Sequence, residues 1–148
     1  MRARLLAIPF VIVSVVAGQQ KSKPDVFFEC DKTAKSQADL NKCAISDDKQ
    51  ADDEMNRAYQ ELLRRAASDE IAVKKIEASQ RAWIAFREAQ IDALYPAENK
   101  MEYGSAFTMC VNLLRADLTQ QRTKMLKEML KRPVEGDVCA TGYPEPSR

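Results

Sequence analysis

Residues 80–90 read QRAWIAFREAQ, and this stretch decides how the chain folds. It holds the only tryptophan, Trp83, with Gln80 three residues before it and Arg87 four residues after it. Steps of three and four place side chains on one face of an α-helix, and Ile91 continues that face. The stretch therefore predicts a helix whose buried face carries an amide and a guanidinium beside its apolar side chains.

A buried guanidinium is costly unless a polar or acidic group compensates it. The preceding helical segment offers such groups at steps of four and three, so we expect a polar network between the two helices. Its expected role is structural, fixing the register of the helices. The alternative is a cleft whose floor is this network. The expected members are Asp52, Asn56, Tyr59, Gln80, Trp83 and Arg87.

The pattern around this stretch predicts an all-α fold. Residues 31–132 hold one glycine, Gly104, and one proline, Pro96, and no alternating strand pattern. Because short connections make consecutive helices antiparallel, we expect a compact antiparallel bundle of three long helices plus one short N-terminal helix, containing disulfides. Serines 36, 46 and 68 are expected to cap the first three helices. The helices are expected over 36–45, 46–67, 68–95 and 105–132 within a domain of residues 33–132.

The first 17 residues have the pattern of a secretory signal peptide. Two arginines precede an apolar run, and small residues at 15 and 17 suit a cut after Ala17. The run is shorter than the ~20 apolar residues of a membrane-spanning helix. We therefore expect residues 1–17 to be cleaved, 18–32 to form an irregular lead-in, and 133–148 to be a flexible tail. The protein would be periplasmic or secreted, with no membrane anchor after cleavage.

Charge and composition exclude several classes of function. Cleavage removes two of the 23 basic residues and leaves 21 against 22 acidic ones, a formal net charge of −1. Nucleic acid is not expected as a partner, because phosphate binding needs a concentrated positive field. The chain has no histidine, which excludes Ser–His and Cys–His nucleophile pairs and removes the commonest metal ligand. We expect a protein that is not an enzyme, with no catalytic residues, cofactor or metal; a hydrolase using the carboxylates of residues 47–54 is the alternative.

Four cysteines in an exported chain are typical of disulfides, and four allow three pairings. Cys30 and Cys43 bracket a loop and a short helix, and they can meet if the lead-in folds back. Cys110 and Cys139 then remain. A continuous helix from Cys110 to Arg132 spans about 33 Å, whereas the seven residues onward to Cys139 reach back at most about 25 Å. A Cys110–Cys139 bridge therefore requires that this helix end early or bend.

The connection YPAENKMEYG, residues 95–104, is the expected contact surface for a partner. Tyrosine and methionine are enriched at the centres of protein interfaces. Binding residues also collect on loops that a rigid scaffold positions. An ordinary helix connection is the alternative. The expected binding residues are Tyr95, Glu98, Asn99, Lys100 and Tyr103.

These motifs together resemble the LprI-type lysozyme-inhibitor domain family, a family of small exported helical proteins. The resemblance covers roughly residues 28–126. It implies a protein that binds another protein, a lysozyme where the family's inhibitory activity is present. It also implies a Cys30–Cys43 disulfide, because these match the family's first two cysteines, whereas Ile91 and Leu114 stand where a second pair is usual. It rests on CDKTAKSQADLNKC, ADDEMNRAYQEL and QRAWIAFREAQ, followed by Gly104-Ser105, Thr119 and Arg122.

The function expected from these features is that of an exported, non-enzymatic binding protein that resembles lysozyme inhibitors. Inhibition would insert the loop of residues 95–104 into the carboxylate-lined cleft of a muramidase. The alternative is an envelope structural or accessory module that binds another protein. A large contiguous apolar patch on the folded surface would distinguish that alternative, since lysozyme binding does not require one.

Overall fold

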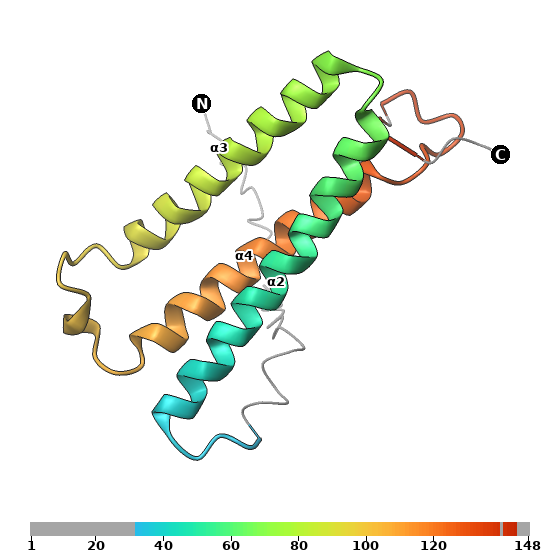
Figure 1. Ribbon diagram of the computed structural model, residues 1–148. Helices are drawn as coiled ribbons and strands as arrows, with labels where there is room; N and C mark the ends of the chain where they lie inside the picture. Colours follow the sequence, from blue (N-terminus) through green and yellow to red (C-terminus); the bar gives the residue numbers. More distant parts are fainter. Residues whose placement is uncertain (1–31, 140, 145–148) are drawn as a thin grey trace, which may run out of the picture.

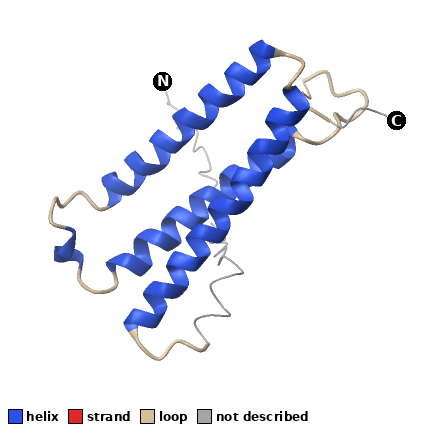
Figure 2. Cartoon of the chain, viewed as in Figure 1, coloured by secondary structure: helices blue, strands red, loops and turns tan. Residues whose placement is uncertain are grey.

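The computed structural model describes residues 32–139 and 141–144 (Figure 1). The predicted signal peptide and nearly all of the lead-in lie outside these residues. Within the described ranges the chain is helical and contains no strand (Figure 2), so the all-α prediction is confirmed. None of the described helices is long and apolar enough to cross a membrane. The elements are α2 (Gln37–Ala66), α3 (Glu70–Leu94), the 3₁₀ helix η1 (Lys100–Tyr103) and α4 (Phe107–Met129).

The α2 and α4 helices run side by side in the same direction and form the closest helix pair (Figure 1). Contacts near both ends fix this parallel pairing. Asn41 Nδ2 donates to the Ser105 carbonyl at 3.1 Å, and Arg65 Nη1 donates to the Leu130 carbonyl at 2.8 Å. The α3 helix runs antiparallel to both. Consecutive helices are thus antiparallel as predicted, whereas α2 and α4 are parallel.

Small buried side chains allow α2 and α4 to approach closely. Ala44, Ala51 and Ala58 recur every seven residues along α2, and all three are buried, as is Ala116 of α4. A seven-residue step keeps side chains on one helix face. The distance between the axes of two packed helices depends on the side chains at the contact. The alanine face of α2 therefore favours a short distance between α2 and α4.

One continuous helix, α2, replaces the two helices predicted over 36–45 and 46–67. Ser36 caps it as expected, since its hydroxyl accepts the Asp39 N–H at 3.2 Å. The break predicted at Ser46 was wrong, and no separate short helix precedes α2 in the described residues. No glycine or proline interrupts the segment, and buried residues on both sides of Ser46 follow one face. These are Cys43, Ala44, Ala51, Met55, Ala58, Leu62 and Ala66.

The cap of α3 is Asp69 rather than the predicted Ser68. The Asp69 carboxylate accepts the N–H groups of Ile71 and Ala72, both at 2.9 Å. Two orphan donors of the first turn are thereby satisfied by one side chain, and its negative charge also suits the helix N-terminus. The helix ends at Leu94, immediately before the loop that was predicted to bind a partner.

The apolar core lies where α2, α3 and the end of α4 meet. Leu62 of α2 and Leu126 of α4 are fully buried within it. Burying such a side chain contributes roughly 1.5–3 kcal/mol. Trp83 packs against this core from α3. The buried members are Met55, Ala58, Leu62, Ala66, Ala72, Ile76 and Leu126.

Part of the C-terminal segment folds back onto the bundle. The Tyr143 N–H donates to the Met129 carbonyl at 2.7 Å, and Arg65 Nη1 donates to the Tyr143 carbonyl at 3.2 Å. Gly142 permits this approach, because a Cβ there would lie 2.9 Å from the carbonyl oxygens of Met129 and Lys131. Residues 141–144 of the tail therefore pack against the ends of α2 and α4.

The cysteines divide into one bonded residue and two free ones among those described. Cys43 is disulfide-bonded, and its expected partner, Cys30, lies outside the described residues. Cys110 and Cys139 are free thiols, so the predicted Cys110–Cys139 bridge was wrong. The reason is the uninterrupted α4, which places Cys110 about 28 Å from Met129 along the helix. The tail returns only as far as Met129, so Cys139 stays at the opposite end of α4.

Candidate functional site

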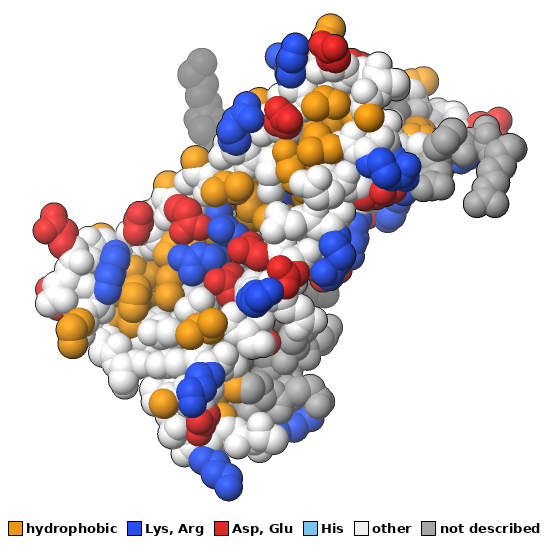
Figure 3. All heavy atoms as spheres, in the orientation of Figure 1, with side chains coloured by type: hydrophobic (Ala, Val, Ile, Leu, Met, Phe, Trp, Pro, Cys, Tyr) orange, Lys and Arg blue, Asp and Glu red, His pale blue; other side chains and the backbone are white. Residues whose placement is uncertain are grey.

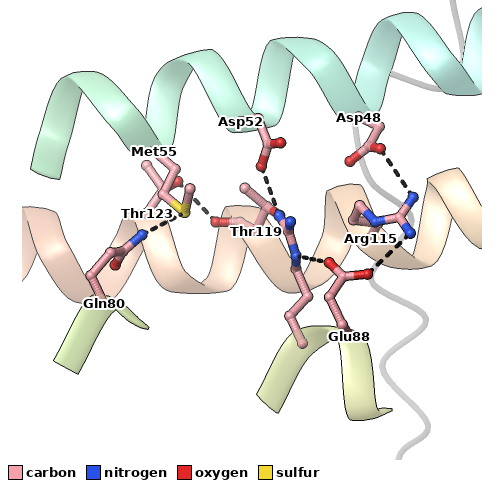
Figure 4. Close-up of polar contacts among 9 residues, drawn as sticks. Asp48, Asp52, Met55, Gln80, Glu88, Arg115, Thr119 and Thr123 are labelled. Carbon is pink, nitrogen blue, oxygen red and sulfur yellow. Dashed lines mark hydrogen bonds and ion pairs between the residues drawn. The ribbon is translucent and has the colours of Figure 1, made fainter. Parts of the chain in front are cut away.

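A charged network joins the three long helices midway along the molecule (Figure 4). Its centre is Arg87 of α3, which is only 8% exposed. Arg87 Nη1 donates to Asp52 Oδ1 of α2 at 2.7 Å and to the Thr119 hydroxyl of α4 at 2.9 Å. Its Nε donates to Glu88 Oε1 at 2.9 Å. One arginine thus connects all three helices.

Arg115 of α4 extends this network toward the start of α2. Arg115 Nη2 donates to Glu88 Oε2 at 3.2 Å, and Nη1 donates to Asp48 Oδ2 at 3.5 Å. Figure 4 shows the resulting row, in which acidic and basic side chains alternate from Asp52 to Asp48. Glu88 is shared by both arginines, so the loss of its charge would weaken two contacts at once.

Burial and ion pairing shift the pKa values of Glu88 and Asp48 in opposite directions. Burial acts to raise the pKa of Glu88, but hydrogen bonds and charge from Arg115 and Arg87 outweigh it and hold that pKa below its ordinary value of 4.5. Burial raises the pKa of Asp48 above its ordinary value of 3.8, although Arg115 opposes the shift. Asp48 Oδ1 is buried with no hydrogen-bond partner among the described residues, which agrees with this direction.

A second cluster of polar side chains surrounds Trp83. Arg122 Nε of α4 donates to Gln80 Oε1 at 3.0 Å, and Arg122 Nη2 donates to Ser79 Oγ at 3.1 Å. The guanidinium carbons of Arg87 and Arg122 lie 5.2 and 5.9 Å from the centre of the Trp83 ring. Both distances are within the range of cation–π attraction. Trp83 therefore contacts two buried arginines.

Four of the six residues predicted for the network lie together, and two do not. Asp52, Gln80, Trp83 and Arg87 belong to the groups just described. Asn56 is exposed and borders an open groove on the outer side of α2. Tyr59 packs its ring against the apolar core instead. The four-residue step from Asp52 turns Asn56 by about 40° around the helix, and spacing alone does not show that this carries it out of the network.

Sequence reasoning gave no role in the network to Glu88, Arg115, Thr119 or Arg122. The last three follow steps of four and three along α4, so they share one helix face. That spacing was a usable signal, the same one that identified Gln80, Trp83 and Arg87. Glu88 carried no such signal, because it is adjacent to Arg87 in sequence.

The acidic residues at 47–54 are largely engaged in ion pairs. Asp53 pairs with Lys49 at 2.5 Å, and Glu54 pairs with Lys127 of α4. Carboxylate-dependent hydrolysis needs two acidic groups that face each other across a pocket. The described residues that border the groove on α2 include Asp53 and Glu61, and both project from the same helix.

The loop of residues 95–104 is stiffened by its own side chains. The Tyr103 hydroxyl oxygen accepts the Ala97 N–H at 2.7 Å, and Lys100 Nζ donates to the Tyr95 carbonyl at 2.5 Å. Asn99 Oδ1 accepts a backbone N–H at 3.2 Å and caps η1. The loop is therefore ordered before any partner arrives.

Three aromatic rings form the base of this loop. Tyr95, Tyr103 and Phe107 lie with ring centres 5.2–5.3 Å apart in pairs. Such pairs contribute about 0.5–1.5 kcal/mol each beyond the area that they bury. Gly104 follows with φ of 74°, a conformation that favours glycine, and turns the chain into α4. The rings anchor the loop to the bundle, so its tip is what faces solvent.

The described residues form a small helical protein in which buried arginines tie three helices together and a stiff loop projects from one end. The chain belongs to the lysozyme inhibitor LprI family, whose family model matches residues 30–126. That range contains the whole charged network and the whole loop. An uncharacterized protein of Rhizobium meliloti (strain 1021) is 33% identical over 143 residues, which cover 88% of this chain and 97% of the relative. No solved structure matches.

Proposed function

We propose that this protein is an exported, non-enzymatic binding protein that inhibits a lysozyme, with the loop of residues 95–104 as its inhibitory element. Membership of a lysozyme-inhibitor family supports a protein partner of this kind. The observation that carries the proposal is Met101, which is 85% exposed at the tip of a loop that is otherwise fixed. A large apolar side chain held in solvent on an ordered loop is suited to enter a cleft.

Order in the free loop favours tight binding. Association costs free energy for every side chain and backbone segment that becomes immobile, at about 0.5–1.5 kcal/mol for each flexible side chain. The contacts of Tyr103, Lys100 and Asn99 already hold this loop. Most of the ordering cost is therefore met during folding and does not reduce the affinity.

The residues of the loop divide into supports and contacts. Tyr95 and Tyr103, predicted to bind the partner, are half-buried in the aromatic base and serve as supports. Glu98, Met101 and Glu102 are exposed and form the contact surface. An apolar tip between two carboxylates suits a cleft that has an apolar subsite and basic groups at its rim. Lysozymes are often strongly basic, which is compatible with such a rim.

A lysis assay tests the proposal. Purified protein is titrated against several lysozyme types acting on peptidoglycan, beside the variants Met101→Asp and Ile71→Asp. Ile71 is also highly exposed, but it lies at the opposite end of α3. We expect dose-dependent inhibition that Met101→Asp weakens at least tenfold and Ile71→Asp leaves unchanged. The absence of inhibition of every lysozyme type at micromolar protein would remove the proposal.

A second candidate function, an envelope accessory module that binds another protein, is favoured by exposed apolar side chains on α3. Ile84, Phe86 and Leu94 are each 40–54% exposed. On the face drawn in Figure 3, the apolar side chains lie in two areas with charged side chains between them, so the described residues of this face form no single contiguous patch of the kind that would distinguish this candidate. The variant Ile84→Ser separates the two functions: loss of capture of an envelope protein with unchanged lysozyme inhibition would favour this candidate.

A further inference from the structure

Arg122 is a buried cation that has no acidic partner among the residues that the structure describes. It is 9% exposed, and its two hydrogen bonds go to the neutral oxygens of Gln80 and Ser79. Arg87 and Arg115, by contrast, each pair with two carboxylates. The three arginines lie in one region of the bundle, yet only two of them are neutralised.

This arrangement is unfavourable for the free protein. Removing a charge from water without a counter-charge costs more than neutral hydrogen bonds and a cation–π contact return. Burial correspondingly lowers the pKa of the Arg122 guanidinium. Within the described part of the chain nothing accepts a hydrogen bond from its Nη1. A guanidinium binds a carboxylate through parallel N–H groups, so Arg122 retains the donors for one.

The orientation of the guanidinium is already fixed. Gln80 and Ser79 hold two of its nitrogens, and Trp83 lies against it. A carboxylate that arrives therefore meets donors that need not be ordered, which favours affinity and selects geometry. Trp83 is the only tryptophan in the chain, so its fluorescence reports on this one position.

Exposed apolar side chains flank the position on both helices. Phe86, 54% exposed, stands seven residues after Ser79 and so on the same side of α3. Met125, 57% exposed, stands three residues after Arg122 on α4. An apolar surrounding strengthens an ion pair, since it lowers the local dielectric once a partner covers it. The same surrounding disfavours a small hydrophilic anion relative to a carboxylate that brings apolar neighbours.

We propose that Arg122 receives the carboxylate of an aspartate or glutamate of the partner protein, at a docking point between α3 and α4. The inference rests on the proposed function, because it assumes a protein partner. Arg122 lies about 22 Å along α4 from Phe107 at the base of the loop. One partner that contacts both the loop and Arg122 would cover a surface of ordinary interface dimensions. The loop tip then supplies insertion, and Arg122 supplies a charge-specific second contact.

The first test uses propionate, which reproduces the end of a glutamate side chain, and propionamide as its neutral counterpart. Each is titrated at constant ionic strength while Trp83 fluorescence and the Arg122 Nε–H NMR signal are followed. We expect saturable binding of propionate in the millimolar range and at least fivefold weaker binding of propionamide. Arg122→Gln should abolish the response, and the exposed Arg81→Gln should retain it. Equal responses to the two compounds, or a response kept in Arg122→Gln, would overturn the inference.

The second test uses a lysozyme and keeps the two proposals separable. We expect Arg122→Gln to raise the dissociation constant at least tenfold, with Arg122→Lys intermediate and Arg81→Gln unchanged. Lysozyme binding that Met101→Asp weakens and Arg122→Gln does not would overturn the role of Arg122 and leave the inhibitory function standing. Selective binding of propionate without binding of any lysozyme would support the carboxylate site and remove the inhibitory function.

Discussion

Arg87 Nη1 and Asp52 Oδ1 lie 2.7 Å apart and tie α3 to α2 at the middle of the bundle. The pair matters because α3 packs less closely against its neighbours than α2 and α4 pack against each other. Thr119 receives a second hydrogen bond from the same nitrogen, so the pair also reaches α4. The position of α3, which carries the loop at its end, therefore depends in part on this buried guanidinium.

Substituting Arg87→Ala should lower the free energy of unfolding by about 3 kcal/mol, since it removes one partner of a buried ion pair and leaves Asp52 uncompensated. The value lies at the lower end of the usual range because the Asp52 side chain is 39% exposed. Urea unfolding measures it. Arg81→Ala is the control and should cost under about 0.5 kcal/mol, because its pair with Glu77 is on the surface. Lost lysozyme binding with an unchanged melting temperature would instead place Arg87 in the binding site.

The stability of the network should depend on pH in two opposite ways. The folded-state pKa of Glu88 is depressed, so its stabilisation is present above about pH 4.5 and is lost as the pH falls through the folded pKa. The folded-state pKa of Asp48 is raised, so its contribution to stability is full below the ordinary pKa of 3.8 and is lost as the pH rises through the folded pKa.

Melting temperatures of the wild type, Glu88→Gln and Asp48→Asn between pH 3 and pH 7 test these signs. The advantage of the wild type over Glu88→Gln should grow as the pH rises. Its advantage over Asp48→Asn should shrink over the same interval. If the curves of both variants ran parallel to the wild-type curve, neither carboxyl group would have the pKa shift described.

Removing the hydroxyl of Tyr103 should loosen the binding loop. Tyr103→Phe leaves the Ala97 N–H without its acceptor, at a cost of about 1 kcal/mol. We expect faster hydrogen exchange at Ala97 and a dissociation constant for lysozyme raised about fivefold. Tyr143→Phe, at the far end of the bundle, is the control. Unchanged exchange at Ala97 in Tyr103→Phe would contradict the role of this hydrogen bond.

The cysteines should react in a definite order. An alkylating reagent should label the exposed Cys139 first and the half-buried Cys110 more slowly, whereas Cys43 should react only after reduction. Reduction should lower stability by about 3 kcal/mol, as expected for a disulfide that closes a loop of this size. Mass spectrometry of a non-reduced digest should find Cys43 linked to Cys30. A Cys110–Cys139 linkage would contradict the structure.

Local pattern was sufficient to predict most of the helical structure. The spacing of Gln80, Trp83 and Arg87 placed all three on one face of a helix, and Ser36 was correctly identified as a cap. Ser46 was misread because a serine followed by acidic residues is favourable at a helix start but is also tolerated inside a helix. Only packing distinguishes the two, since the buried face continues through that point.

The site was predicted only in part, because local sequence pattern shows which residues share a helix face but not how the helices pack. Spacing identified Asp52 as a partner of Arg87, because the buried faces of both helices can be recognised from their sequence pattern. Spacing places Arg115, Thr119 and Arg122 on one face of α4, but identifying their partners required the register of α4 against the other helices. That register is set by the alanine face of α2 and by tertiary contacts, and neither is encoded in the local pattern of α4. That Arg122 meets neutral oxygens rather than a carboxylate likewise follows from this register, since its hydrogen bonds go to Gln80 and Ser79 of α3.

The most direct test of the account is the affinity of the purified protein for a lysozyme, measured by calorimetry with the wild type and Met101→Asp. The account predicts a dissociation constant of about 1 μM or lower for the wild type and one at least tenfold higher for the variant. Absence of binding to several lysozyme types, or equal affinity of the two proteins, would contradict the proposal that the loop of residues 95–104 inhibits a lysozyme.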